Sequence, residues 1–238
     1  MKNEASRYLE KCLEWNRPFV DELFVYDDCS TDSSVEIAKG YATVVRQDGD
    51  VGFMEHEGKF REQAWRAFES EMNPINGDWV LSFDADEMLT TRRSSSPGDV
   101  RAELDKVVDT SGLSVSIEIP FLEMFQVDQA GIHSYRIDGF WGTIKAQRFF
   151  AYKEGGFFSP KAMGCGSAPT YVSTGPCRGT SRDLLFLHYG YALFDDRTSR
   201  YDRYSSLVES GHNPRHIESI LQHPTLSRWY GPHPDLSQ

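Results

Sequence analysis

Short apolar runs alternate with helix-like stretches along the first half of the chain. Runs bounded by turn residues predict buried strands, and apolar residues spaced three or four apart predict helices. The predicted strands are residues 23–26, 42–46 and 79–83. The predicted helices are residues 3–17, 33–40, 58–70 and 96–108. Because helices connect the successive strands, we expect an α/β fold, in which a mainly parallel sheet is flanked by helices.

The pattern is less regular in the second half. The strands predicted there are residues 113–119, 146–152 and 184–188. Tyrosines and aliphatic residues at helical spacing after residue 200 predict one helix, and Asn213 followed by Pro214 predicts the start of another. The expected division is a first half (residues 1–120), a second half of the same domain (residues 121–192) and a helical C-terminal extension (residues 193–238).

Composition excludes some classes of partner and leaves an enzyme open. The chain has 238 residues, of which 39% are hydrophobic and 13% aromatic, as expected of a folded globular protein. Its net charge of -11 argues against nucleic acid or an anionic membrane as the main partner, since both attract clustered Lys and Arg. The four cysteines lack the paired spacing of metal ligands, and no apolar stretch reaches the roughly 18 residues that cross a membrane. With no signal peptide in the sequence, we expect a cytoplasmic protein with reduced thiols.

Three carboxylates directly follow the third predicted strand. Asp84, Asp86 and Glu87 lie where that strand ends, and ligand sites in α/β sheets lie at the carboxyl ends of strands. Neighbouring ionised carboxylates repel one another unless a cation lies between them, and Mg²⁺ or Mn²⁺ prefers such oxygen ligands. Because these ions also hold phosphates, the cluster predicts a metal-bound diphosphate. A solvated acidic turn is the alternative interpretation.

A second pair of acids ends the first predicted strand. Asp27 and Asp28 follow residues 23–26 and precede a polar turn into a helix. In a parallel sheet this end faces the same edge as Asp84 and Asp86. A carboxylate at Asp28 can accept an N–H of uracil or guanine, which predicts a reader of the nucleobase. Capping of the following helix is the alternative role.

Three segments carry a resemblance to a known family. They are Lys2–Ala5 (KNEA), Val25–Asp32 (VYDDCSTD) and Gly77–Glu87 (GDWVLSFDADE). In this order and spacing they resemble the successive motifs of family 2 glycosyltransferases of the GT-A fold, over roughly the first 120 residues. The resemblance implies a nucleotide-diphosphate sugar as donor, with UDP favoured and GDP compatible, and Mn²⁺ or Mg²⁺ as cofactor. The first half of the domain would then bind the donor and the second half the acceptor.

The resemblance also implies roles for single residues. Asp28 contacts the nucleobase, Asp84 contacts the ribose or a water on the metal, and Asp86 binds the metal. Basic residues of the third predicted helix meet the donor phosphates, although a solvated helix face is an alternative for them. The donor-binding residues that the resemblance implies are Asn3, Glu4, Asp28, Lys59, Arg61 and Asp84.

A further stretch, Leu187–Tyr191 (LHYGY), resembles a subset of these enzymes that often come from phage or bacteria. The resemblance implies His188 as the third metal ligand, and an imidazole ligand favours Mn²⁺ over Mg²⁺. A hydrogen-bonded packing role is the alternative for a lone histidine. Arg197 and Arg200 follow, and they either approach the diphosphate or pair with the aspartates beside them.

Family membership implies sugar transfer with inversion at the anomeric carbon. A carboxylate then removes the proton of the acceptor hydroxyl, while metal and basic side chains neutralise the departing nucleotide diphosphate. Asp138 is the favoured base, because Phe140 and Trp141 beside it offer a surface for a sugar ring. Glu123 and Asp128 are the rival bases, and the start of a turn is the alternative role of Asp138.

One departure from the family concerns the start of the chain. Family members begin with a buried strand before the Lys-Asn-Glu loop, and here Met1 stands where that strand should end. We expect that the recorded start is late, that the chain is a fragment, or that the sheet is completed in another way. Two unpaired strand edges in the core cost stability. We therefore expect poor stability, or a homo-oligomer that forms through an open edge.

Other functions remain open on sequence alone. A non-catalytic nucleotide- or sugar-binding protein of the same fold is the main rival to the enzyme. A nucleotidyltransferase uses similar carboxylates, but the Gly-rich basic loop typical of that class is not found in the sequence. A phosphatase would have Thr or Val soon after the second Asp, where Glu87 and Met88 stand. For the enzyme, a glycan or protein acceptor is favoured over a lipid, because the chain is acidic and lacks a membrane segment.

Overall fold

The computed structural model describes residues 1–47, 52–94, 96–111, 116–162, 164, 166–175, 177–206, 214–234 and 236. Its helices are α1 (Leu9–Asn16), α2 (Ser34–Lys39), α3 (Glu57–Met72), α4 (Pro97–Ser111), α5 (Thr170–Thr174), α6 (Phe194–Ser205) and α7 (Pro214–Ile220), with the 3₁₀ helices η1 (Arg17–Phe19) and η2 (Gly139–Thr143). Its strands are β1 (Phe24–Asp27), β2 (Thr43–Arg46), β3 (Trp79–Leu81), β4 (Glu87–Thr91), β5 (Ser116–Val127), β6 (His133–Arg136), β7 (Lys145–Ala151), β8 (Cys177–Thr180), β9 (Leu184–His188) and β10 (Leu226–Arg228). The start of the strand predicted at 113–119 and the predicted cap Asn213 lie outside the described residues.

The first part of the chain builds a small parallel sheet. β1 and β2 pair in parallel over four residue pairs, while α2 packs on β2 and α3 packs on β1. The strands and helices that the apolar pattern predicts before residue 82 are all present, with bounds that differ by a few residues. Local periodicity therefore predicts this part of the fold well.

The first helix begins later than predicted. α1 starts at Leu9, whereas the sequence predicts a start at Asn3. Asn3 has a left-handed backbone with φ of 52°, and its side-chain oxygen accepts a hydrogen bond from the Thr31 N–H at 2.8 Å. Residues 3–8 are thereby held against the loop that follows β1, so they precede the helix and border the edge where the predicted donor residues lie.

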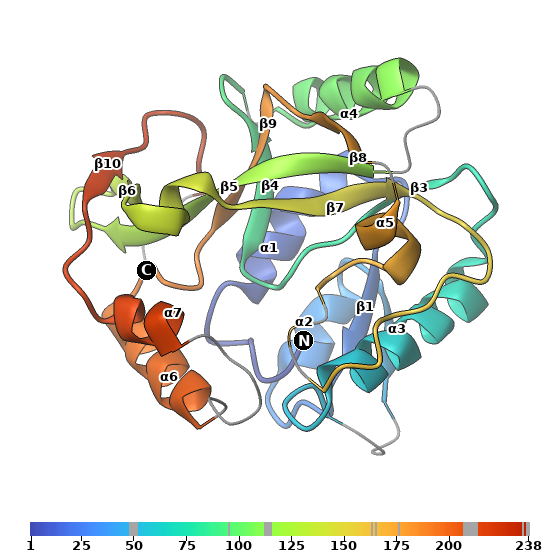
Figure 1. Ribbon diagram of the computed structural model, residues 1–238, viewed down its shortest axis with the longest axis horizontal. Coiled ribbons are helices and arrows are strands. Elements are labelled where there is room, and N and C mark those ends of the chain that lie inside the picture. The colour runs from blue at the N-terminus through green and yellow to red at the C-terminus, as the bar shows by residue number, and fades with distance from the viewer. Residues whose placement is uncertain are drawn as a thin grey trace.

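The main sheet is mostly antiparallel, so the prediction of a mainly parallel sheet was wrong. β5, which is 12 residues long, pairs antiparallel with β6 and β7; β7 pairs antiparallel with β3, and β4 with β9. Of the described strands in this eight-stranded sheet, β8 and β9 run parallel to β5. β5 and β7 lie side by side across the molecule (Figure 1). The connections from β5 to β6 and on to β7 contain no α-helix, and such short connections favour antiparallel pairing.

A strand that the sequence did not predict lies directly after the acidic cluster. All five residues of β4 are buried, and β4 pairs with β9 from Glu87 opposite His188 to Thr91 opposite Leu184. β9 lies in the centre of the core, where Leu184, Leu185, Phe186 and Leu187 have no exposed surface. The acidic loop between β3 and β4 is therefore held at both ends by core strands.

The two sheets are separated by a cavity of about 1100 Å³. Apolar side chains of helices and strands line it, among them Leu13 of α1, Val25 of β1, Phe68 of α3 and Leu81 of β3. Within the described part of the chain, β1 pairs with β2 alone and β3 pairs with β7 alone as regular strands. This gap is the place where the sequence predicts a missing strand.

Met1 occupies one end of this gap. Its amino group donates to the Tyr26 carbonyl at 2.8 Å, and its own carbonyl accepts from the Asp28 N–H at 2.7 Å. These two bonds place Met1 opposite Asp27, as one residue of a parallel strand would be placed. Burial lowers the pKa of the Met1 amino group, although the nearby carboxylates of Asp27 and Asp84 oppose this shift.

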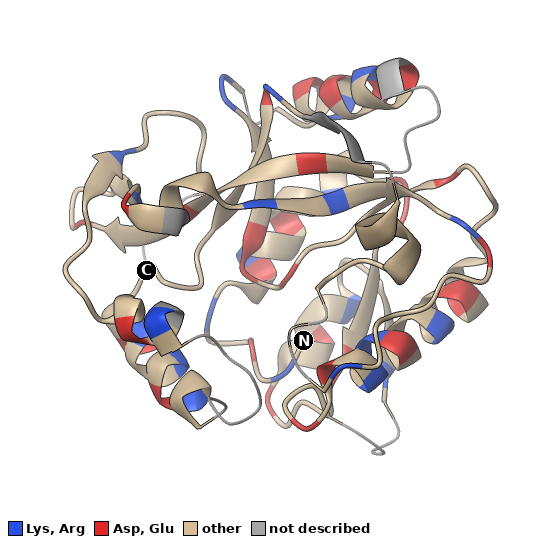
Figure 2. Ribbon diagram, viewed as in Figure 1, with Lys and Arg blue, Asp and Glu red and all other residues tan. Residues whose placement is uncertain are grey.

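Charges of both signs are interspersed on the surface helices. Figure 2 shows acidic and basic residues together on α3 and on α6, consistent with a chain whose net charge is -11. α6 and α7 pack against each other on one side of the molecule (Figure 1). Among the helices that are described, none combines the length and the apolar character needed to cross a membrane.

Candidate active site

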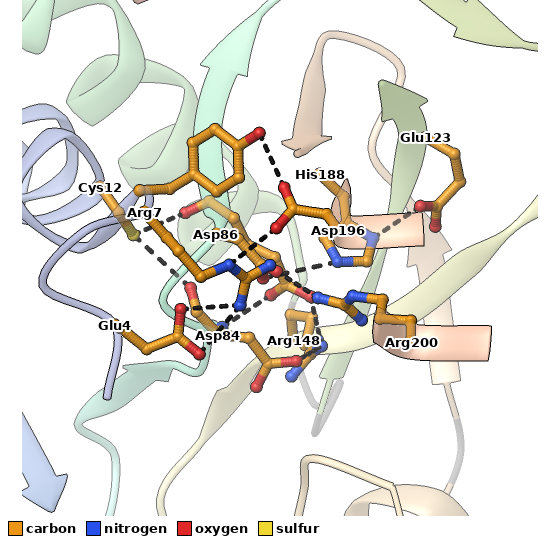
Figure 3. A network of polar contacts seen from close by, with 12 residues as sticks. Glu4, Arg7, Cys12, Asp84, Asp86, Glu123, Arg148, His188, Asp196 and Arg200 are labelled. Atoms are coloured by element: carbon orange, nitrogen blue, oxygen red, sulfur yellow. Dashed lines mark hydrogen bonds and ion pairs between the residues drawn. The ribbon is translucent and has the colours of Figure 1, made fainter. Parts of the chain in front are cut away.

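Asp86 lies at the centre of a buried polar network (Figure 3). Its Oδ1 lies 3.4 Å from Nε2 of His188, and its Oδ2 accepts a hydrogen bond from Arg200. The pairing of β4 with β9 brings Asp86 and His188 together, and the Tyr189 N–H donates to the Asp86 carbonyl at 2.9 Å. Although burial opposes ionisation, Arg200 and His188 hold the pKa of Asp86 well below its usual range.

His188 is fixed by a carboxylate on its other side. Its Nδ1 donates to Oε2 of Glu123 at 2.6 Å, because the parallel register of β5 and β9 places the two residues opposite each other. Burial lowers the pKa of His188, but the carboxylates of Glu123 and Asp86 outweigh burial and raise it well above its ordinary value. A histidine whose Nδ1 is held by a carboxylate presents Nε2 in a fixed direction, an arrangement common among metal-binding histidines.

Asp84 and Glu87 share a buried arginine that sequence reasoning missed. Nη2 of Arg148, on β7, lies 3.1 Å from Asp84 Oδ2 and 2.6 Å from Glu87 Oε1. Although partial desolvation opposes ionisation, the charge of Arg148 lowers the pKa of Asp84, whose side chain is 49% exposed, to about 2. Within the described part of the chain, Nε and Nη1 of Arg148 are buried and have no hydrogen-bond partner. The available sequence signal was a charged residue inside the strand predicted at 146–152.

Asp28 lies at the end of β1 with its carboxylate nearly fully buried. It accepts hydrogen bonds from the Gln47 side chain and from the Phe53 N–H at 3.1 Å, and Nζ of Lys2 lies 3.6 Å away. The cap of the following helix, which was the alternative role, is supplied by Asp32, whose Oδ1 accepts from the Ser34 N–H at 3.0 Å. Asp28 therefore faces the polar end of the cavity.

The cavity brings together most of the predicted donor-binding residues. Those that line it are Asn3, Glu4, Asp28, Arg61, Asp84 and Asp86, together with Arg200. Arg61 donates to Oε1 of Glu57 at 2.8 Å, and its guanidinium lies over the Phe53 ring. Lys59, which is two residues from Arg61 and therefore on another face of α3, lies outside the residues that line this cavity. Asp84 and Asp86 with Arg61 thus meet at one place, as the motifs predict.

The structure gives Asp138 a partner that the sequence did not predict. Both of its carboxylate oxygens lie 2.7 Å from the guanidinium of buried Arg136, and Oδ1 also accepts from the Thr225 N–H at 3.2 Å. The bond to Arg136 lowers the pKa of Asp138, which makes it a weaker base. Trp141 is 2% exposed and packs in the core against Phe125, so it is not available to stack on a sugar, contrary to the expectation.

The rival bases also have partners. Glu123 is 4% exposed and holds His188, as described above. Asp128 closes the turn between β5 and β6, where its Oδ1 accepts from the N–H groups of Ala130 and Ile132, each at 2.9 Å. The structure therefore places all three candidates in supporting contacts, and the identity of the base stays a prediction.

The two arginines of α6 have different partners. Arg197 donates to the carbonyls of Phe125 and Tyr191, each at 2.7 Å, and thereby ties α6 to the sheet. Arg200 reaches Asp86 instead of the aspartates beside it in the sequence. Of those aspartates, Asp196 pairs with Arg7 at 3.0 Å.

The residues around Asp86 fit a divalent cation in part. In the described portion of the chain, no group of three or more His, Cys, Asp or Glu forms a cluster that could hold a metal, so the predicted set of Asp84, Asp86 and His188 is not gathered. Asp86 and His188 nevertheless offer an oxygen and a nitrogen that face each other, a donor pair suited to Mn²⁺. The guanidinium of Arg200 already sits on Asp86 as a cation. The donor pair therefore fits a cation that takes its other ligands from a bound phosphate.

Comparison with known proteins supports the resemblance seen in the motifs. Residues 1–94 match the family described as Glycosyl transferase family 2. The match includes Asp28, Asp84 and Asp86, and it ends before Glu123, Arg148 and the other residues that complete the network from the second half. None of the curated proteins matches the chain. The chain therefore carries a Glycosyl transferase family 2 domain over residues 1–94.

Proposed function

We propose that this protein moves a sugar from a nucleotide-diphosphate donor, with a UDP-sugar favoured, to a hydroxyl of a glycan or protein acceptor, with inversion and with the help of a divalent cation. The main support is the cavity in which Asp28, Asp84 and Asp86 meet the basic side chains of Arg61 and Arg200. We also propose the cytoplasm as its location, which rests on the sequence alone.

The cavity offers each part of a nucleotide-sugar a suitable partner. Asp28, at one side, can accept an N–H of uracil or guanine in place of one of its present donors. Arg61 and Arg200 also line the cavity, and a guanidinium is a good partner for phosphate oxygens. Arg148 keeps Asp84 ionised, so that the carboxylate can accept from ribose hydroxyls. These contacts favour a charged, hydroxyl-rich ligand over an apolar one.

Asp86 and His188 are the residues that would hold the cation. When bound, Mn²⁺ would neutralise charge that develops on the departing nucleotide diphosphate. Glu123 fixes the direction of the His188 ring and holds the proton at Nδ1, which keeps Nε2 turned toward Asp86. The network around Asp86 is buried, which limits water at the reacting centre.

Glu123→Gln is expected to weaken Mn²⁺ binding in the presence of UDP by about 10- to 100-fold, because the amide holds the His188 ring less firmly than the carboxylate does. The affinity is measured by calorimetric titration. Glu118→Gln, the same change on the same strand, serves as control and should bind as the wild type does. Equal Mn²⁺ affinity in Glu123→Gln and the wild type would contradict the role given to Glu123.

Asp138→Asn tests the predicted base. Since Asp138 holds buried Arg136 through two charged bonds, the free energy of unfolding is expected to fall by about 2 kcal/mol. Urea unfolding measures this loss, and kcat is measured on protein shown to be folded. A drop in kcat of about a hundredfold or more in the folded variant would assign the base to Asp138, whereas an unchanged kcat would show that its role is structural.

Calorimetric titration of UDP and then GDP, each with and without Mn²⁺, tests the proposed function. Binding that requires Mn²⁺ and prefers one nucleotide supports the donor site and selects the sugars to assay. Donor hydrolysis that depends on Mn²⁺ then supports the enzyme. Binding without turnover of any donor would favour the non-catalytic nucleotide- or sugar-binding protein, and absence of binding to folded protein would contradict the proposal.

A further inference from the structure

We propose that Arg200 is the counter-ion of Asp86 as long as no divalent cation is bound there. A divalent cation that binds Asp86 displaces the Arg200 guanidinium, and the guanidinium then pairs with the diphosphate of the donor. This inference rests on the proposed function and adds to it a coupling between cation binding and nucleotide binding. It concerns Arg200 on α6, a helix that lies outside the residues matched by the family.

The contact between Arg200 and Asp86 is close and buried. Nη2 of Arg200 donates to Oδ2 of Asp86, and the two side chains are 13% and 7% exposed. Gly190 makes room for this contact, because a Cβ at that position would collide with both the guanidinium and the carboxylate. The chain is therefore built to let Arg200 reach Asp86 across 114 residues of sequence.

The other contacts of Arg200 are weak enough to allow movement. Nη1 lies 3.4 Å from the Tyr204 hydroxyl, and the guanidinium lies 4.9 Å from the centre of the Tyr191 ring. Nε is buried and has no hydrogen-bond partner among the residues that the structure describes. A buried donor without an acceptor is costly, so an anionic oxygen delivered to this place would be bound.

Arg200 also lies where a diphosphate would be bound. Together with Arg203 and Tyr204 it lines, from α6, the same cavity that Asp28 and Asp84 line. A short movement away from Asp86 leaves the guanidinium inside the same cavity. An anion that enters the cavity can therefore pair with the Arg200 guanidinium after it has left Asp86.

Electrostatics makes the two cations exclude each other at Asp86. The carboxylate already faces Arg200 at one oxygen and His188 at the other. A divalent cation at this carboxylate would lie next to the guanidinium, and like charges at such short distance repel strongly in a buried site. Moving Arg200 away from Asp86 costs free energy by itself, because a buried ion pair is broken. The movement becomes favourable when the phosphate oxygens of a bound diphosphate pair with the guanidinium. Cation and nucleotide should therefore each raise the affinity for the other by the same factor.

The experiment measures Mn²⁺ affinity by calorimetric titration and electron paramagnetic resonance, with and without UDP. For the wild type we expect UDP to strengthen Mn²⁺ binding by about 5- to 150-fold. For Arg200→Gln we expect Mn²⁺ alone to bind about tenfold more tightly than to the wild type, and most of the effect of UDP to be lost. Arg66→Gln, the same change on the exposed face of α3 and outside the residues that line the cavity, should behave as the wild type does. Circular dichroism and thermal melting check that each variant is folded.

Several results would overturn the inference. A wild-type Mn²⁺ affinity that UDP leaves unchanged would do so without any variant. Arg200→Lys keeps the positive charge and should bind Mn²⁺ less tightly than Arg200→Gln does. Equal Mn²⁺ affinity of the two variants would show that the positive charge at this position is not what weakens Mn²⁺ binding in the wild type. A third result would overturn the inference alone. If Arg200→Gln leaves Mn²⁺ affinity unchanged or lowers it, the inference fails. The proposed function still stands in that case, provided that UDP and Mn²⁺ bind together and that this binding requires Asp86. If UDP and Mn²⁺ fail to bind the folded wild type, the proposed function itself fails.

Discussion

Replacing Asp86 with asparagine is expected to lower sugar transfer by about a hundredfold or more. Asparagine keeps the shape of the side chain but removes the charge that faces His188 and Arg200 in the buried network. A metal ion contributes several kcal/mol of charge stabilisation in the transition state, and each 1.4 kcal/mol changes the rate about tenfold. The rate is measured as Mn²⁺-dependent donor hydrolysis and as transfer to an acceptor.

The control for this variant separates chemistry from folding. Asp99→Asn removes one carboxylate from the exposed first turn of α4, outside the residues that line the cavity, and it should keep full activity. Because the loss of Asp86 leaves buried Arg200 without its counter-charge, thermal melting must show that Asp86→Asn is folded at the assay temperature. Wild-type turnover in folded Asp86→Asn would contradict the assignment of Asp86 to the reaction.

Adding an apolar strand in front of Met1 is expected to raise the melting temperature by about 6–12 °C. Such a strand would continue the parallel pairing that Met1 already makes with β1, and it would fill the apolar part of the cavity, between β1 and β3, and leave the part lined by the acidic residues open. It would also replace the buried charge of the Met1 amino group with a peptide bond. Burial of about two apolar side chains contributes about 3 kcal/mol, and each kcal/mol shifts the melting temperature of a chain of this size by about 2–4 °C.

A matched extension gives the control for this prediction. An addition of the same length made of Ser, Gly and Asp adds the same number of residues but no apolar surface, and it should leave the melting temperature unchanged. Light scattering after size-exclusion chromatography tests the related prediction of a homo-oligomer, because the apolar strand should reduce association through the open edges. Equal melting temperatures for the two extensions would mean that the cavity does not take up a strand.

Local pattern determined the elements of the first half. β1, α2, β2, α3 and β3 appear where the apolar periodicity predicts them, because each buries a continuous stripe or run of its own residues. β9 has the predicted bounds for the same reason. The acidic residues Asp28, Asp84 and Asp86 were recognisable because they end strands, a position that depends on neighbours in the sequence alone.

Contacts between distant residues were decided only by the tertiary structure. The sheet is mostly antiparallel because β5 is long and its neighbours return through short connections, which periodicity within single strands does not reveal. Asp138 pairs with nearby Arg136, an ion pair that the sequence allowed but did not require. A strand signal specifies which side chains share a face, but the partner strand specifies what that face contacts.

The candidate site shows the same division. The sequence by itself determined which carboxylates stand at strand ends and that they belong to a glycosyltransferase domain. The tertiary structure decided their partners: Arg148 for Asp84, and His188 and Arg200 for Asp86. These partners come from β7, β9 and α6, 64 to 114 residues away from the acids. Burial of so many like charges in one place requires opposite charges, and only the packing of β7, β9 and α6 around the acidic loop determines which residues supply them.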